Sequence, residues 1–221
     1  DKQWNRGQDI YRIITVNKMG DGLYNRFSNS FTWLPAALKD NFPEVETGSY
    51  ISGYEQRFRL NVADRDGIKT TALSADTNVW KVLDIHVISG NPKTFVAGEN
   101  GNLIISESFR NKYFPNENPV GKIIYDLPVF SDKSKPFLIT GVIRDLPSNS
   151  IFRSDVIIQT LPFADELNKK EWGTFVQNFL LLRHGTDISK FTKKVNTWYA
   201  GYVESKAPSQ FEFQSLKNAY L

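Results

Sequence analysis

The sequence predicts an α+β fold, in which strands and helices are mixed. Alternating polar and apolar residues, a pattern typical of strands, run through Tyr54–Val62 and Ile68–Leu73. A helical period of apolar residues runs through Ile188–Val203. Strands and helices do not alternate regularly along the chain, and this disfavours a doubly wound parallel sheet. We therefore expect an α+β protein.

The composition is that of an ordinary folded protein. The chain has 221 residues, of which 40% are hydrophobic and 23% charged, so it can bury a core. Its net charge of +3, without any run of five or more Lys or Arg residues, argues against a nucleic-acid partner. The chain contains no cysteine, which excludes disulfides, thiolate metal sites and a thiol nucleophile.

The first elements are a strand and a short helix. Tyr11–Val16 is rich in β-branched residues and predicts a strand, whereas Lys18–Ser30 is rich in Gly, Asn and Ser and predicts a loop. Trp33–Asn41 predicts a helix, since Pro35 falls in its first turn, where a missing N–H costs little. Pro43 ends this helix, because it pushes the residue before it away from helical geometry.

A β-hairpin and a long loop follow. Tyr54–Val62 and Ile68–Leu73 are the strands of the hairpin, and the turn Asp64–Gly67 joins them. Thr77–Ile85 predicts a short helix or a turn. Ser89–Asn102 contains three Gly and one Pro and therefore predicts a loop.

The centre of the chain predicts a strand followed by a capped helix. Leu103–Ile105 is the strand, Ser106 is the N-cap, and the helix runs over Glu107–Tyr113. Pro115 ends this helix. Further strands are predicted at Val120–Tyr125, Phe137–Ile143 and Ser154–Gln159.

The last part of the chain contains the clearest helix. Asp187 is the expected N-cap of Ile188–Val203. Before it, Pro162–Lys170 predicts a helix, and Phe175–Arg183 predicts a strand that is buried on both faces, because it holds three consecutive Leu residues. Phe211–Leu216 predicts the closing strand.

The two ends of the chain suggest a fragment. No apolar run reaches the roughly 18 residues that a membrane helix needs, and no signal peptide opens the chain. Strand-like patterning nevertheless begins soon after residue 1 and continues to residue 221. We therefore expect that flanking segments of a longer protein have been removed.

One turn resembles part of a calcium-binding loop. Asp64 and Asp66, followed by Gly67, have the spacing of its central positions. In that register Val62 occupies the first ligand position and Leu73 the closing position, where an acidic residue is needed. The sequence therefore favours a hairpin turn over a calcium site.

Histidines and serines do not form a recognisable catalytic motif. His86 and His184 are the only histidines, too few for a histidine-only zinc site, although a single-histidine site with carboxylates stays open. A serine triad needs one of these histidines. Ser106 and Ser108 lie in ISES and lack the flanking glycines of a nucleophile elbow. We interpret both histidines as ordinary surface or packing residues.

Phosphate and sugar sites are not indicated either. Gly121-Lys122 is not a P-loop, because Asn116 replaces the first glycine and Ile123 replaces the Ser or Thr that holds magnesium. Gly121 is better explained as a turn glycine. Trp172 and Trp198 could stack on a sugar, but core packing is the favoured interpretation. The sequence thus predicts no catalytic, cofactor-binding or metal-binding residues and no cofactor.

Six segments carry a resemblance to a known family: LKDNFPEVE (Leu38–Glu46), ADTNVWKVLDIHVISGNP (Ala75–Pro92), IISESFRNKYFPNENPVGK (Ile104–Lys122), TGVIRDLPSNS (Thr140–Ser150), FLLLRHGTD (Phe179–Asp187) and FQSLKNAYL (Phe213–Leu221). In this order they resemble the extracytoplasmic domains of MacB-like (FtsX-like) ABC transporter permeases. The chain departs from the family pattern at Val79-Trp80, His86 and Ile151-Phe152. The resemblance covers nearly the whole chain.

The resemblance implies a mechanical role. The domain would lie on the periplasmic side of the bacterial cytoplasmic membrane, between the first two membrane helices of an efflux or lipoprotein/peptide export permease. Such permeases form homodimers or heterodimers, pair with a cytoplasmic ATPase and contact adaptor or cargo proteins. The domain itself would be no enzyme and would transmit ATP-driven motion. It would have two lobes, a membrane-proximal lobe from about 1–75 and 138–221 and an inserted β-rich lobe at about 76–137.

Two other functions stay open. An extracytoplasmic ligand-sensing domain of a membrane receptor kinase also lies between two membrane helices. Three or more hydrophobic spans after Leu221 favour the permease, whereas one span followed by a kinase-like region favours the sensor. A hydrolase is the third alternative, and it requires a deep pocket with convergent polar groups.

Overall fold

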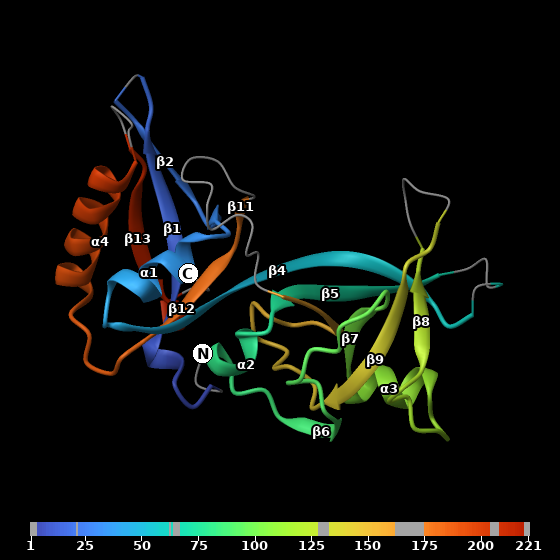
Figure 1. Ribbon diagram of the computed structural model, residues 1–221. Coiled ribbons are helices and arrows are strands. Elements are labelled where there is room, and N and C mark those ends of the chain that lie inside the picture. The colour runs from blue at the N-terminus through green and yellow to red at the C-terminus, as the bar shows by residue number, and fades with distance from the viewer. Residues whose placement is uncertain are drawn as a thin grey trace. The chain divides into compact units, whose positions relative to one another are not determined.

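The computed structural model describes residues 4–20, 22–61, 63, 67–127, 133–161, 175–203 and 208–218. It shows the predicted α+β fold (Figure 1). The contacts divide the chain into unit 1 (Asp1–Ile51, Lys81–Asp84 and Pro162–Leu221) and unit 2 (Ser52–Trp80 and Ile85–Leu161). Unit 2 begins before and ends after the inserted lobe that was predicted at about 76–137, and those lobe boundaries stay a prediction.

Unit 1 contains an antiparallel sheet. Its strands are, in order, β13 (Gln210–Ser215), β1 (Ile10–Lys18), β12 (Asn178–Leu182) and the first part of β4 (Val45–Arg59). β13 occupies one edge of β1 from Tyr11 to Val16. The other edge is shared by β12, which pairs at Ile10–Arg12, and by β2 (Tyr24–Phe27), which pairs at Thr15–Lys18.

Strand β2 corrects a prediction. Residues 18–30 were expected to form a loop, but Tyr24–Phe27 pairs antiparallel with β1. The Met19 N–H donates to the Leu23 carbonyl at 2.7 Å and closes the turn between the two strands. The strand could not be recognised from composition, because Gly, Asn and Ser residues surround it. It is stabilised by its pairing with β1, which is a tertiary contact. A two-residue ladder of β3 (Ser30–Phe31) and β11 (Phe175–Val176) also interrupts the single strand predicted at Phe175–Arg183.

Two helices cover the core of unit 1, as predicted. α1 (Leu34–Asn41) has Pro35 in its first turn and ends where Phe42 takes an extended conformation, with φ −130°. α4 (Ile188–Tyr202) begins at Asp187, whose side chain accepts a hydrogen bond from the Lys190 N–H. The buried side chains of this core include Trp33, Leu34, Leu38, Phe42, Leu180, Phe191, Val195, Tyr199 and Phe211. Each such side chain contributes roughly 1.5–3 kcal/mol through burial.

Asn196 of α4 occupies the outer edge of β13. Its side-chain amide donates to the Phe211 carbonyl at 3.0 Å and accepts from the Phe211 N–H at 2.7 Å. The amide therefore takes the place of a neighbouring strand at this residue. Such blocking matters because an unpaired sheet edge invites the addition of foreign strands.

Unit 2 contains a ring of strands. The second part of β4 is followed by β5 (Ile68–Asp76), β10 (Val156–Thr160), β7 (Gly101–Ser106), β9 (Pro136–Ile143) and β8 (Ile123–Asp126), and β8 pairs again with β4. β6 (Val87–Gly90) pairs with the far end of β9. β6 and the start of β7 shorten the loop predicted at Ser89–Asn102. The strands of the predicted hairpin are neighbours, while the turn residues 64–66 lie outside the described residues.

Helix α3 (Glu107–Tyr113) covers the core of unit 2 and has the predicted bounds. The Ser106 hydroxyl accepts from the Phe109 N–H at 3.0 Å, which confirms the cap. Gly121 has φ +90°, as expected of a turn glycine. α2 (Val79–Val82) is the predicted short helix. The helix predicted at Pro162–Lys170 lies outside the described residues, and within the described part no helix has the length and apolarity needed to cross a membrane.

Candidate functional site

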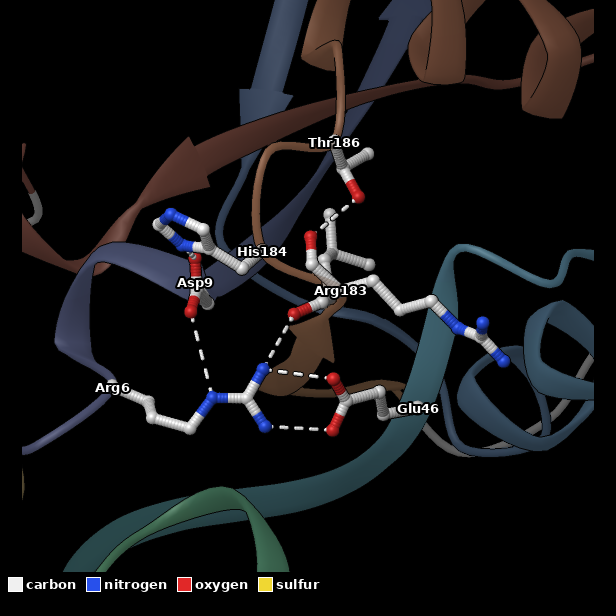
Figure 2. A network of polar contacts seen from close by, with 7 residues as sticks. Arg6, Asp9, Glu46, Arg183, His184 and Thr186 are labelled. Carbon is white, nitrogen blue, oxygen red and sulfur yellow. Dashed lines mark hydrogen bonds and ion pairs between the residues drawn. The ribbon is translucent and has the colours of Figure 1, made fainter.

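A polar joint holds the beginning of the chain to the sheet of unit 1. Arg6 precedes the short 3₁₀ helix η1 (Gly7–Asp9) and lies at the centre of the joint (Figure 2). Its guanidinium donates to both carboxylate oxygens of Glu46 on β4, at 2.7 and 2.8 Å. It also donates to the Leu182 carbonyl at the end of β12, at 3.2 Å. One side chain thus connects the N-terminal segment to two strands.

Asp9 and the turn after β12 complete the joint. Asp9 is buried and lies 3.4 Å from Arg6 Nε and 3.1 Å from Nδ1 of the exposed His184. The turn itself is fixed, because the Thr186 hydroxyl donates to the Arg183 carbonyl at 2.7 Å and the Arg183 N–H donates to the Glu44 carbonyl at 2.8 Å. These contacts join η1, β4 and the approach to α4 in one network (Figure 2).

Charge pairing stabilises the ionised carboxylates of β4 and of the residue before it. Hydrogen bonding to Arg6 holds the pKa of Glu46 below its usual value, and the same contact raises the pKa of Arg6. Lys194 of α4 lies 2.6 Å from Glu44 and lowers the pKa of that carboxyl by hydrogen bonding. A bidentate Arg–carboxylate contact also fixes geometry, because two parallel bonds resist rotation. The joint can therefore hold and orient a segment.

Three of the four candidate catalytic residues, Ser106, Ser108 and His184, have structural partners. The two histidines belong to different units: His86 is exposed in unit 2, and His184 is exposed in unit 1. Ser106 caps α3, and the Ser108 hydroxyl donates to Asp145 at 2.5 Å. Neither serine therefore meets a histidine.

The residues weighed for metal and sugar binding were Asp64, Asp66, Trp172 and Trp198. The first three lie outside the described residues. Trp198 stacks on Tyr202 with ring centroids 4.9 Å apart and meets Phe42 edge to face at 5.7 Å, which is the packing role that the sequence favoured. Among the described residues, no group of three His, Cys, Asp or Glu side chains lies close enough to hold a metal ion.

Two hollows lie beside β2. The first has a volume of about 550 Å³ and is lined by Asn17, Arg26, Phe27, Ser28, Asn29 and Phe175. The second has a volume of about 380 Å³ and is lined by Ile14, Arg26, Phe27, Ser28, Glu212, Phe213 and Gln214. Both are open, Arg26 lines both, and its ion pair with Glu212, at 3.0 Å, lies in the second. Such shallow surfaces suit contact with another polypeptide better than enclosure of a small substrate.

Comparison with known proteins gives a consistent result. The family model of the MacB-like periplasmic core domain matches residues 2–197. A domain assigned to a permease protein from Porphyromonas gingivalis superposes with a TM-score of 0.75 at 19% identity, covering 96% of this chain and 93% of that one. The periplasmic region of MacB from Actinobacillus actinomycetemcomitans gives 0.60 at 15% identity, covering 96% and 90%.

A third solved structure belongs to a different bacterial group. The extracellular domain of the noncanonic ABC-type transporter YknZ from Gram-positive bacteria gives a TM-score of 0.61 at 14% identity, covering 91% of this chain and 98% of that one. At these identities the structures support the fold. No curated protein sequence matches the chain.

Proposed function

Because the chain belongs to the family of MacB-like periplasmic core domains, we propose that it is the extracytoplasmic domain of an ABC transporter permease. The family is a periplasmic permease domain and not a catalytic one. In the proposed role, the domain lies on the periplasmic side of the bacterial cytoplasmic membrane, as part of a multi-pass, FtsX-like permease. A separate cytoplasmic ATPase hydrolyses ATP, and the domain transmits the resulting motion to cargo or partner proteins during efflux or export.

Strand β4 is the observation that supports transmission. It runs without interruption for 15 residues, and it contributes Val45–Ile51 to unit 1 and Ser52–Arg59 to unit 2. Near its start, Glu46 is held by the bidentate contact with Arg6. A displacement of the N-terminal segment is therefore passed to β4 through the Arg6–Glu46 contact, and the continuous backbone of β4 passes it on to unit 2.

The proposed role also assigns partners. Two permease copies, identical or different, pair in the membrane, and each engages an ATPase through its membrane part. An adaptor or cargo protein contacts the exposed surface of the domain. No nucleic-acid partner is proposed, in keeping with the net charge of +3.

The full-length protein provides the test. We expect one hydrophobic helix before Asp1 and at least three after Leu221, with residues 1–221 accessible to protease from the periplasmic side in spheroplasts. An intact inner membrane should protect the cytoplasmic loops in the same sample, which serves as the control. One span followed by a kinase-like region would instead favour a sensor, and the lack of any flanking helix would refute the permease assignment.

A further inference from the structure

Strand β2 has one paired edge and one free edge. It pairs with β1, and among the described strands no other pairs with it. All four of its residues are exposed, with Tyr24 at 54% and Phe27 at 45% of their full accessibility. An antiparallel strand directs its backbone N–H and C=O groups alternately to its two edges, so the free edge of β2 presents unpaired groups.

Side-chain contacts protect the β13 edge at Phe211, and among the described residues no contact of this kind protects the free edge of β2. At β13 the Asn196 amide pairs with both backbone groups of Phe211. β2 has fewer protections: its sequence YNRF holds no Pro or Lys and its register with β1 contains no bulge, which leaves only its short length and the charge of Arg26.

The sequence of β2 is complementary to itself in one register. When a strand pairs antiparallel with its own copy, opposed residues must both be hydrogen-bonded or both be non-bonded, so the two-fold axis passes through one residue and its mate. With the axis at Asn25, Tyr24 faces Arg26 of the other copy, a cation–π contact, and the two Asn25 amides face each other. Leu23, which is 66% exposed, then faces Phe27.

Neighbouring registers are less favourable. An axis at Arg26 places two guanidinium groups directly opposite each other, and like charges in opposed positions are destabilising. An axis at Tyr24 places Leu23 opposite Asn25 and leaves Phe27 outside the pairing. Only the register at Asn25 places Arg26 of each copy against an aromatic ring and also pairs Leu23 with Phe27.

We propose that the free edge of β2 pairs antiparallel with β2 of a second copy of this chain, with the two-fold axis at Asn25. The inference deepens the proposed function, since it names the surface through which two permease copies touch outside the membrane. A strand of four residues buries less than the roughly 1,200 Å² of a stable interface, so the contact is weak between free domains. Membrane anchoring of both copies raises their effective concentration and makes the contact productive.

The absence of native cysteine allows a direct test by Asn25→Cys. Opposed Cα atoms in antiparallel strands are about 4.5–5.5 Å apart, within the range that a disulfide spans. We expect Asn25→Cys to form a covalent dimer under oxidised glutathione, measured by non-reducing electrophoresis. Met19→Cys is the matched control, because it is exposed in the same hairpin, at 45%. In the proposed register, however, it lies opposite Leu23 on the far side of β2 and is about 20 Å from its mate, beyond disulfide reach.

Asn25→Cys should crosslink at least about ten times faster than Met19→Cys, because only its mate lies within disulfide reach. Tyr24→Thr in the Asn25→Cys background keeps β-propensity but removes the ring, and it should slow crosslinking at an unchanged melting temperature. Equal crosslinking rates for Asn25→Cys and Met19→Cys would overturn the proposal. The edge of β2 would then be available for pairing with a strand of another protein. That result would leave the permease assignment untouched, since the topology test of the full-length protein decides it separately.

Discussion

At the scale of single residues, long-range contacts could not be predicted from the sequence, whereas local packing could. Arg6 and Glu46 form the centre of the polar joint, yet they are 40 positions apart and each looks like an ordinary surface charge in the sequence. The i,i+3 spacing of Arg6 and Asp9 is the only local signal for the joint. By contrast, Trp198 was correctly interpreted as a packing residue, because its helical period with Phe191 and Val195 is visible in the sequence.

Glu46→Gln tests the joint through its dependence on pH. The Arg6–Glu46 pair is more than one third exposed, so we expect the substitution to cost about 0.5–1 kcal/mol at pH 7. Arg6 lowers the pKa of Glu46 from 4.5 by hydrogen bonding. The stabilisation is therefore present above pH 4.5 and is lost as the pH falls through the lowered pKa.

Urea unfolding of Glu46→Gln at pH 7 and pH 3 measures this loss. Glu55→Gln, on the same strand but paired with Lys69 at a more exposed site, is the control and should change stability less at pH 7. A cost for Glu46→Gln that stayed constant between the two pH values would contradict the role of the ionised carboxylate.

Tyr199 gives a second prediction, at alkaline pH. Burial raises the pKa of Tyr199 to about 12, against an ordinary value of 10.0. The unfolded chain releases this proton first, so stability should fall above pH 10, by up to about 1.4 kcal/mol per pH unit. Tyr199→Phe keeps the ring and should be nearly neutral at pH 7 while losing less stability at pH 11, as measured by urea unfolding. If the wild-type protein and Tyr199→Phe lost the same free energy of unfolding between pH 7 and pH 11, the raised pKa of Tyr199 would be contradicted.

At the scale of elements, local signals were sufficient for helices but not for strand pairing. The caps Ser106 and Asp187 were recognisable because a cap acts within three residues of itself. β2 was missed because its partner lies in β1 and because Gly, Asn and Ser residues surround its two strand-forming residues, Tyr24 and Phe27. Similarly, the register of β12 with β4 depends on chain segments about 130 residues apart.

Asn196→Ala should show that the amide closes the β13 edge. The substitution leaves both the N–H and the carbonyl of Phe211 without their partner, at a cost of about 1–3 kcal/mol. Thermal unfolding measures the loss. Thr197→Ala is the control, since Thr197 is the exposed neighbour on the same helix, and it should have little effect. Equal melting temperatures for the two variants would show that the amide contributes nothing to the edge.

At the scale of the whole molecule, the fold class and the family could be predicted from the sequence, while the bounds of the two units follow from contacts. Unit 1 combines both ends of the chain with residues 81–84, so no local pattern outlines it. Unit 2 is nearly continuous in sequence, and its strands pair in a ring. Units with separate cores can open separately.

Phe191→Ala tests whether the two cores are independent. Phe191 is 1% exposed in the core of unit 1, and its truncation should cost about 3–5 kcal/mol. Native-state hydrogen exchange should then show lost protection in α4 and β13, with β7 and β9 still protected. Phe109→Ala, in the core of unit 2, should give the reverse pattern. Equal loss of protection in both units after either substitution would show that the protein opens as one body.

The uninterrupted course of β4 has a mechanical consequence. Its hydrogen bonds to β12 and β8 lie across the strand axis, as in any antiparallel pair. A pull along that axis places these bonds in shear, so that they carry tension together, whereas a pull across the strand would peel them apart one after another. β4 should therefore resist extension when it is pulled along its length.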